Sequence, residues 1–551
     1  MNCRFIFVVG GVISGLGKGI TTASLALLLE QAGYSTTVIK ADPYLNLDAG
    51  TMNPIIHGET FVTEDGLETD QDIGHYERFL NRSLTRLNYM TAGQVFLSVI
   101  ENERQLKYKG ECVEFVRHVP EEINKRLTKL ASVTKAEVVI VEIGGTVGDI
   151  QNILFLESIR QLKLKLRNQV MVIHVAYLPL PKTLGELKSK PAQQSVSFLL
   201  ASGVQPDLIV TRAEMPIDNL RKAKIATFCN VYEEDIIDNP DLEDVYQVPN
   251  YLLKQGLVTR VKQKLNLGTK KSQPELKKAW QKIVKQTKAQ KLGPKIAIVG
   301  KYFQSGTYAL EDSYVCVIEA LKQAYYANGF KPNYTWINSQ LIEKQGPDSL
   351  NDFAGIIVPQ GWGSRGVEGK ILAARFSREH QLPYLGLCFG MQMAVIEFAR
   401  NVLGYKTANS TEVDANTKDP VIDLMISQQK VLKQRRYGGT IRLGAWPAKI
   451  KPKTKLEQAY KQFPNTHFVL PIVQERHRHR YEFNSKYLSE FEKNGMIASA
   501  KSPDGKLVEA IELLDHPFFV GVQYHPEYKS RPLSVHPLFL AFISKAAVYK
   551  S

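Results

Sequence analysis

Residues 5–19 read FIFVVGGVISGLGKG, an apolar run followed by a glycine-rich loop that ends in Lys18. We predict a buried strand at Phe5–Val9, a loop at Gly10–Gly19 and a helix at Ile20–Gln31 that Gly33 ends. Backbone N–H groups of such a loop, together with the positive end of the helix, are suited to binding phosphate. The order strand, loop, helix therefore predicts a phosphate-binding loop.

The loop differs from a strict Walker pattern at two positions. That pattern requires glycine where Val12 stands and Ser or Thr where Gly19 stands. A glycine-rich turn with a surface lysine is the alternative interpretation, and the order of the flanking elements makes it the less favoured one.

Further apolar runs along the chain indicate more strands, separated by helical stretches. This pattern is typical of parallel sheets covered on both faces, so we predict an α/β fold. A P-loop-like α/β domain is expected at residues 1–267, and a second α/β domain at 295–551. The predicted strands are Thr36–Ile39, Val138–Val141, Val170–Val175, Leu208–Val210, Ile296–Val299, Gly355–Val358 and Tyr384–Leu387, with a helix at Ser313–Ala327.

Residues 268–294 between the two domains are rich in lysine, and Glu275 is the one acidic residue there. We interpret them as a basic interdomain linker with an amphipathic helix near Leu276–Val284. A nucleic-acid contact is the less favoured alternative.

Composition limits the class of protein. The chain has 551 residues, 44% of them hydrophobic, which excludes a largely disordered or membrane-embedded protein. No apolar run is long enough for a membrane helix, and no signal peptide is indicated. Five cysteines without a CxxC pair indicate neither disulfides nor a zinc cluster, so a reducing cytoplasm is expected. The formal charge of +15 suits anionic ligands, but it equally fits a lysine-rich surface.

Carboxylates follow the phosphate loop in the sequence. Asp70 and Asp72 lie in a polar stretch, and Glu142 ends a predicted strand just before Gly144. Carboxylates at strand ends beside a phosphate loop are suited to holding Mg²⁺ against a triphosphate. A solvated acidic loop is the alternative for Asp70.

The second domain contains a candidate nucleophile. Gly386-Leu387-Cys388-Phe389-Gly390 lies between a predicted strand and the helical run Met391–Arg400, as in a nucleophile elbow. We predict a strand at Val520–Tyr524 and expect His525 and Glu527 to face the same side of an extended chain, as base and orienting carboxylate. His477 and His479 are rival bases within a basic run that resembles an anion site or a solvated strand.

Together these residues resemble CTP synthases, the glutamine-hydrolysing enzymes, over the whole chain. The resemblance rests on many segments in both domains. These are Gly10–Gly19, Asp42–Tyr44, Asp48–Met52, Gly74–Phe79, Glu142–Ile150, Gly361–Lys370, Pro383–Gln392, Ala408–Glu412, Gly438–Ala445, Glu475–Glu482 and Gln523–Glu527.

The resemblance implies a reaction. The N-terminal domain would use magnesium ATP to phosphorylate UTP, and ammonia would then give CTP. The C-terminal class I glutamine amidotransferase domain would release that ammonia from glutamine. It also implies activation by GTP, inhibition by CTP and a cytoplasmic homotetramer, with no organic cofactor and no nucleic-acid or membrane partner. Filament formation stays open.

Site residues follow from the same resemblance, position by position. Cys388, His525 and Glu527 match the catalytic triad, and Asp72 and Glu142 match the magnesium ligands. ATP would be bound by Gly15, Leu16, Gly17, Lys18, Gly19, Ile20 and Asp72. UTP and CTP would be bound by Ser14, Asp149, Ile150, Gln151, Lys188, Ser189, Lys190, Pro191, Ala192, Gln193 and Lys224. Glutamine would be bound by Gly361, Phe389, Gly390, Met391, Gln392, Glu412 and Arg480.

Four residues depart from the family pattern. Gln360 replaces Gly and Phe389 replaces Leu beside the amide pocket, while Gln151 replaces Glu and Ala192 replaces Thr near the pyrimidine site. None of them removes a catalytic group. We expect Gln360 to keep a negative φ, because a non-glycine residue is strained at positive φ.

Other functions were weighed. Another ATP-dependent amidotransferase, such as a cobyrinic acid amidating enzyme, would lack the pyrimidine segment 188–193. A non-catalytic scaffold would have no need of the intact catalytic groups. The positive charge is the one observation that would support a nucleic-acid-binding function.

Overall fold

The computed structural model describes residues 3–549 except 14, 302–303, 306–307, 310, 435–437, 464 and 466. The chain forms two compact units, and each is described by itself. The first contains residues 1–47 and 75–284, and the second contains residues 48–74 and 285–551. The sequence-based boundaries stay a prediction. They place 48–74 with the first domain, whereas the structure packs this segment into the second unit.

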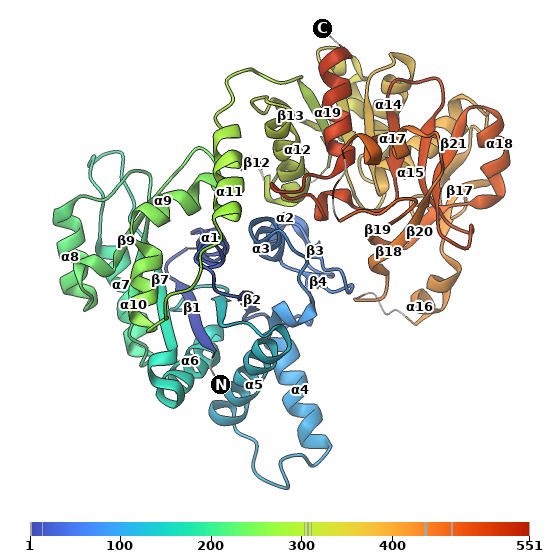
Figure 1. Ribbon diagram of the computed structural model, residues 1–551. Coiled ribbons are helices and arrows are strands. Elements are labelled where there is room, and N and C mark those ends of the chain that lie inside the picture. Colours follow the sequence, from blue (N-terminus) through green and yellow to red (C-terminus); the bar gives the residue numbers. More distant parts are fainter. Residues whose placement is uncertain are drawn as a thin grey trace. The chain divides into compact units, whose positions relative to one another are not determined.

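A parallel sheet forms the centre of the first unit (Figure 1). Alternate residues of its strands face opposite sides, so Phe5, Phe7 and Val9 enter the core shared with α4, α5 and α6. The predicted strands of this half are confirmed. In spatial order the strands are β5 (Tyr89–Thr91), β2 (Thr36–Asp42), β6 (Val138–Ile143), β1 (Arg4–Gly10), β7 (Val170–Tyr177), β8 (Leu208–Ala213) and β9 (Ile236–Pro240).

Helices connect these strands. The first begins at Lys18, two residues before the predicted start, because Gly17 caps it with φ 86°. The helices are α1 (Lys18–Gln31), α3 (Asp72–Leu80), α4 (Ala92–Arg104), α5 (Phe115–Thr134), α6 (Ile153–Leu166), α7 (Lys190–Ala201), α8 (Asn219–Cys229), α9 (Val248–Lys254), α10 (Leu257–Lys264) and α11 (Pro274–Gln286).

The predicted linker helix is confirmed as α11, but its surroundings differ from those of a solvated linker. Trp280 is fully buried, and its ring lies 5.1 Å from that of Phe79 and 5.9 Å from that of Tyr246. The start of the lysine-rich stretch therefore packs on the first unit through one aromatic side chain.

The second unit contains a mixed sheet, parallel on one side and antiparallel on the other. Ala297 and Val299 of β10 face the core with α14 and α15, while Ile296 and Ile298 face the core with α12 and α19. In spatial order its strands are β13 (Tyr334–Asn338), β10 (Ile296–Gly300), β14 (Gly355–Val358), β15 (Tyr384–Leu387), β23 (Phe519–Val522), β22 (Val508–Leu513), β21 (Met496–Lys501), β18 (Arg442–Ile450) and β19 (Ile472–His479).

Smaller elements complete this unit. A 3-10 turn at Glu311–Tyr314 replaces the first residues of the predicted helix 313–327. The helices are α2 (Pro54–His57), α12 (Val315–Ala327), α13 (Ser339–Gln345), α14 (Val367–Glu379), α15 (Phe389–Asn401), α16 (Gln429–Lys433), α17 (Lys455–Gln462), α18 (Leu488–Lys493) and α19 (Pro537–Tyr549). The short strands are β3 (Phe61–Val62), β4 (Glu68–Thr69), β11 (Gln304–Ser305), β12 (Tyr308–Ala309), β16 (Ala408–Ser410), β17 (Asp419–Leu424) and β20 (Tyr481–Phe483). Among the helices that the structure describes, none is long and apolar enough to cross a bilayer.

Candidate active sites

The glycine loop connects β1 to α1 at the carboxyl end of the first sheet, where parallel sheets bind ligands. Gly15 and Gly17 adopt positive φ, which glycine tolerates without strain. The nearly buried Lys18 donates from Nζ to the carbonyl of Gly145 at 2.7 Å. This bond ties the lysine to the loop that follows β6.

Val12 shows how the loop departs from a Walker pattern. It adopts φ 64°, the left-handed conformation for which the pattern uses glycine. A β-branched residue is strained there, so the backbone conformation is kept although the residue is not glycine. Ser14, predicted to contact UTP or CTP, lies outside the described residues.

Glu142 ends β6 and is 1% exposed. Its carboxylate accepts from Lys40 Nζ at 2.8 Å and from the hydroxyl of Tyr76. Asp72 belongs to the segment packed in the second unit, where its N–H donates to Asp70 Oδ1 at 2.8 Å. Within the described part of the chain no three His, Cys, Asp or Glu side chains gather as a metal site.

The predicted pyrimidine residues divide into two sets. Ser189 and Ala192 are buried at the start of α7, and Gln193 donates to Ser189 Oγ at 3.1 Å. This segment touches the phosphate loop, because a Cβ added at Gly11 would lie 2.1 Å from Cβ of Ser195. The other set lies nearer the surface of the first unit: Ile150, Gln151, Lys190 and Lys224 are exposed, and Asp149, Lys188 and Pro191 are half-buried.

Cys388 occupies a strained turn between β15 and α15. Its φ of 51° and ψ of −100° lie outside the backbone regions that residues other than glycine usually adopt. Neither flanking glycine could carry a side chain without a steric clash. A Cβ at Gly390 would lie 1.9 Å from the carbonyl oxygen of Val358, and a Cβ at Gly386 would lie 2.8 Å from the carbonyl carbon of Gly390. The geometry is that of a nucleophile elbow, which presents the thiol at a helix N-terminus.

His525 and Glu527 form the pair that the sequence suggests, but by a different backbone path. The strand β23 ends at Val522, and Glu527 lies in a 3-10 turn, so the expectation of an extended chain is wrong. His525 Nδ1 nevertheless lies 2.8 Å from Glu527 Oε1, and both side chains are buried. Burial opposes a charged imidazole, yet Glu527 and the Cys388 thiolate together raise the pKa of His525 to about 10.

The rival histidines are already engaged. His477 Nε2 lies 2.8 Å from Glu509, and His479 Nδ1 lies 2.9 Å from the carbonyl of Tyr481. Both are buried, and burial lowers their pKa. A solvated strand is therefore the wrong interpretation of this run. The neighbouring Arg478 faces the segment 48–74 instead, with Nε 2.8 Å from Glu68.

The predicted glutamine residues meet around Cys388. Gly361, Phe389, Gln392, Glu412 and Arg480 line one pocket with Cys388 and His525. Gly390 and Met391 are buried in the first turn of α15 behind it.

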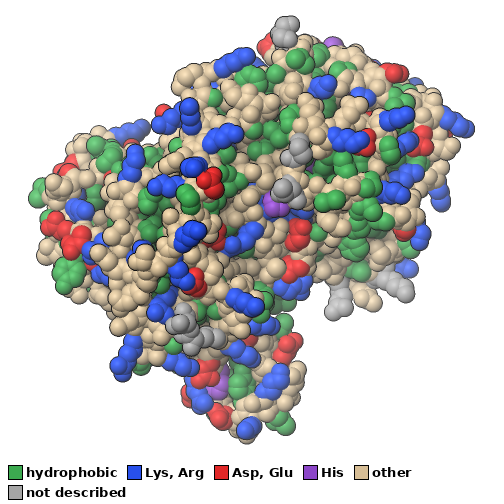
Figure 2. Space-filling view, in the orientation of Figure 1, with side chains coloured by type: hydrophobic (Ala, Val, Ile, Leu, Met, Phe, Trp, Pro, Cys, Tyr) green, Lys and Arg blue, Asp and Glu red, His purple; other side chains and the backbone are tan. Residues whose placement is uncertain are grey.

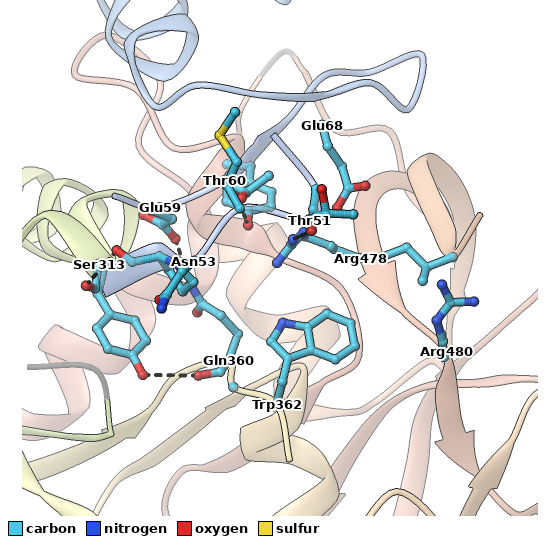
Figure 3. A pocket seen from close by; sticks show the side chains of 17 residues that line it. Thr51, Asn53, Glu59, Thr60, Glu68, Ser313, Gln360, Trp362, Arg478 and Arg480 are labelled. Atoms are coloured by element: carbon cyan, nitrogen blue, oxygen red, sulfur yellow. Dashed lines mark hydrogen bonds and ion pairs between the residues drawn. The ribbon is translucent and has the colours of Figure 1, made fainter. Parts of the chain in front are cut away.

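A larger cavity of about 520 Å³ adjoins this pocket and shares Gln360, Gly361, Trp362, Arg478 and Arg480 with it. Figure 3 shows its far wall, which Thr51, Asn53 and Glu59 of the segment 48–74 supply. The second unit thus holds a nucleophile pocket and an adjoining cavity that is walled by residues from early in the chain.

Comparisons with known proteins agree in both halves of the chain. The family model "CTP synthase N-terminus" matches residues 4–267, and "Glutamine amidotransferase class-I" matches residues 309–545. The CTP synthase of Caldanaerobacter subterraneus is 48% identical over 98% of this chain and 97% of its own. That of Sulfolobus acidocaldarius is 48% identical over 99% of both chains. The chain belongs to the CTP synthase family.

A solved structure, the Trypanosoma brucei CTPS glutaminase domain with bound acivicin, is 34% identical. The alignment of the two structures covers 46% of this chain and 94% of the Trypanosoma brucei chain, with a TM-score of 0.41.

Membership of the CTP synthase family makes the chain a glutamine-dependent amidotransferase and a ligase of pyrimidine biosynthesis. The family uses ATP, UTP and glutamine. The expected α/β fold, with an N-terminal synthase half and a C-terminal amidotransferase half, is confirmed.

Two of the four residues that we expect to depart from the family pattern lie beside Cys388. Gln360 does not adopt positive φ, as expected. The ring of Phe389 lies 4.8 Å from Lys301 Nζ and 5.3 Å from Lys370 Nζ, so it faces the amino groups of two lysines. Burial lowers the pKa of Lys301 to about 8 and that of Lys370 well below its ordinary value.

Sequence reasoning missed several residues that shape this site. Lys301 and Lys370 contact the loop 359–363, and Tyr528 stacks on His525 with ring centroids 4.8 Å apart. Tyr528 directly follows the catalytic motif, and Lys301 follows a predicted strand. Their positions next to a motif and a strand end could therefore have marked them as site residues. Lys370 lies inside a helix and offers none.

Proposed function

We propose that this chain converts UTP, ATP and glutamine into CTP, ADP, phosphate and glutamate. The observation that supports this most strongly is the elbow that bears Cys388 beside the His525–Glu527 pair, in one chain with a separate phosphate loop. One centre would release ammonia and the other would activate the acceptor.

In the glutaminase half, the Cys388 thiolate attacks the side-chain amide carbon of glutamine. The C–N bond breaks and the His525 imidazolium gives its proton to the departing ammonia, leaving a thioester. Water, deprotonated by His525, then releases glutamate and restores the thiol. Glu527 keeps Nδ1 of the imidazole protonated throughout, and the N-terminus of α15 stabilises the oxyanion.

In the synthase half, the uracil O4 of UTP takes the γ-phosphoryl group of ATP, and ADP leaves. Ammonia attacks C4 and phosphate leaves, giving CTP. Lys18 and the loop N–H groups hold the phosphates, where positioned charge provides most of the catalysis. The cavity beside the nucleophile pocket supports a protected exit for ammonia.

The carboxylate of Glu142 is a suitable magnesium ligand. Mg²⁺ takes one or two carboxylates together with phosphate oxygens, and Glu142 supplies a buried carboxylate at a strand end. Asp72 would be the second ligand. When bound, the ion neutralises charge on the triphosphate. Lys40 balances the Glu142 carboxylate at 2.8 Å.

Regulation by GTP and CTP and a homotetramer with shared nucleotide sites form part of the proposal. Exposed apolar side chains gather on α4, the start of α5 and the turn after Asp149, and they support an interface there. They are Leu97, Ile100, Phe115, Val116, Ile150 and Ile153.

Gln151 in the same turn predicts weaker CTP feedback, because a neutral amide accepts hydrogen bonds less strongly than the family's carboxylate. Gln151→Glu should strengthen CTP inhibition about fivefold, which corresponds to about 1 kcal/mol. CTP inhibition of both proteins at one UTP concentration measures this.

The face of the protein that Figure 2 shows does not single out a nucleic-acid site. Figure 2 shows Lys and Arg side chains scattered over the visible face among acidic and apolar ones, without one continuous basic patch.

Product analysis with UTP, ATP and either glutamine or ammonia tests the proposal. Cys388→Ala should abolish glutamine-dependent CTP formation and leave ammonia-dependent formation largely intact. Lys18→Ala should abolish both. Equal loss of both activities in Cys388→Ala would contradict the assignment of two centres.

A further inference from the structure

The loop Pro359–Gly363, between β14 and α14, is fixed through its carbonyl groups. Lys370 Nζ donates to the carbonyl of Pro359 at 2.8 Å and to that of Gln360 at 3.3 Å. Lys301 Nζ donates to the carbonyls of Trp362 and Gly363. The C=O and the following N–H of a trans peptide point in opposite directions. The bond to the Gln360 carbonyl therefore turns the N–H of Gly361 away from Lys370.

Gln360 adds a side-chain contact to this loop. Its Nε2 donates to Glu59 Oε1 at 2.6 Å, and Glu59 Oε2 accepts from the N–H of Cys316 at 2.7 Å. Glu59 is 3% exposed, so this charge-assisted bond is shielded from water. Figure 3 shows Glu59 and Gln360 at the wall of the same cavity. The glycine that the family carries at this position has no side chain to make such a bond.

The residue after Glu59 contacts Tyr528, which stacks on the catalytic base. The carbonyl of Thr60 accepts from the hydroxyl of Tyr528 at 3.0 Å, and the Tyr528 ring stacks on His525 with an angle of 11° between the rings. Two consecutive residues of the segment 48–74 thus contact the loop on one side of the centre and, on the other side, the tyrosine that stacks on the base.

We propose that Gln360 is a positioning residue for glutamine hydrolysis, which acts through its bond to Glu59. The bond fixes the loop against the segment 48–74. Gly361 of this loop lines the pocket of Cys388, and its N–H would donate to the oxyanion together with the N-terminus of α15. The inference rests on the proposed role of Cys388. Because the oxyanion exists only in the transition state, loss of the bond lowers kcat more than it raises KM.

Four variants test this: Gln360→Ala, Gln360→Glu, Glu59→Gln, and the double variant that combines Gln360→Glu with Glu59→Gln. Gln360→Ala should lower glutaminase kcat about tenfold, the lower limit for a buried charge-assisted bond. Gln360→Glu should lower it further, because it places two carboxylates together. The double variant exchanges amide and carboxylate, and it should recover to within about threefold of Glu59→Gln. Glu59→Gln controls for the bond to Cys316.

Ammonia-dependent CTP formation separates this inference from the proposed function. All four variants should keep it, because the loop plays no part in that reaction. The inference is overturned if Gln360→Glu retains full glutaminase kcat, if the double variant is as slow as Gln360→Glu, or if KM alone changes. Loss of ammonia-dependent synthesis in Gln360→Ala would also overturn it. If the unaltered chain forms no CTP even from ammonia, the proposed function fails instead.

Discussion

The carboxylate of Glu527 sets the charge of the catalytic base. Its Oε1 lies 2.8 Å from His525 Nδ1, and the side chains of the two residues are 0% and 1% exposed. Burial alone would lower the pKa of His525. Glu527 and the Cys388 thiolate overcome burial and raise this pKa from the ordinary 6.5 to about 10. The raised pKa favours a protonated imidazole, which holds the proton that ammonia needs.

Glu527→Gln removes the charge and keeps an oxygen that accepts from Nδ1–H. Losing an opposite charge at hydrogen-bond distance lowers a pKa by about 1–3 units. The imidazolium is stable below its pKa, so the alkaline limit of glutaminase activity should move to lower pH by that amount. Between the new alkaline limit and the old one the imidazole of the variant loses its proton, so kcat in that range should fall by up to about tenfold for each pH unit.

Glutamate release measured across the neutral and alkaline range gives both quantities. Ammonia-dependent CTP formation by the same preparation is the control, and it should be unchanged because it needs no imidazolium. An alkaline limit that stays in place, with kcat near that of the unaltered chain, would refute the electrostatic role of Glu527.

Three further predictions follow from particular contacts. Gly390→Ala places a Cβ 1.9 Å from the Val358 carbonyl, so α15 must shift, and glutaminase kcat should fall about 10²-fold with ammonia-dependent synthesis kept. Val12→Gly relieves about 1–2 kcal/mol of backbone strain but adds unfolded-state entropy, so the free energy of unfolding, measured with denaturant, should rise by less than about 1 kcal/mol. For Glu64, burial opposes the charge, but Arg476 and Lys529 lower the pKa from 4.5 to about 2. Its stabilising effect is present above pH 4.5 and lost toward pH 2, and Glu64→Gln should flatten thermal stability across that window.

Sequence periodicity was most reliable for buried strands. Phe5–Val9 and Tyr384–Leu387 are apolar on both faces because helices cover both sides of each sheet, and such runs are easily recognised. Helix starts were less accurate. The helix predicted from Ile20 begins at Lys18, since Gly17 caps it in a left-handed conformation that no apolar pattern encodes.

The candidate sites were predictable where a local motif constrains the backbone. Glycines on both sides of Cys388 indicated the elbow, and each one avoids a close contact. The backbone conformation between His525 and Glu527 was not predictable. The observed 3-10 turn brings the two side chains together, and so would the extended chain that we expected, so their proximity does not distinguish the two conformations. Lys370 could not be found, since its role depends on where α14 packs beneath the loop that precedes it.

The segment 48–74 explains why domain boundaries drawn along the sequence differ from the compact units. Glu64 lies 2.7 Å from Arg476, and Glu68 lies 2.8 Å from Arg478, so two carboxylates of this segment pair with two arginines of β19. The carbonyl of Arg478 is in turn 3.8 Å from Sγ of Cys388. Glu64 and Glu68 are each more than 400 residues from their arginine partners, and no periodic pattern in the sequence signals such pairs.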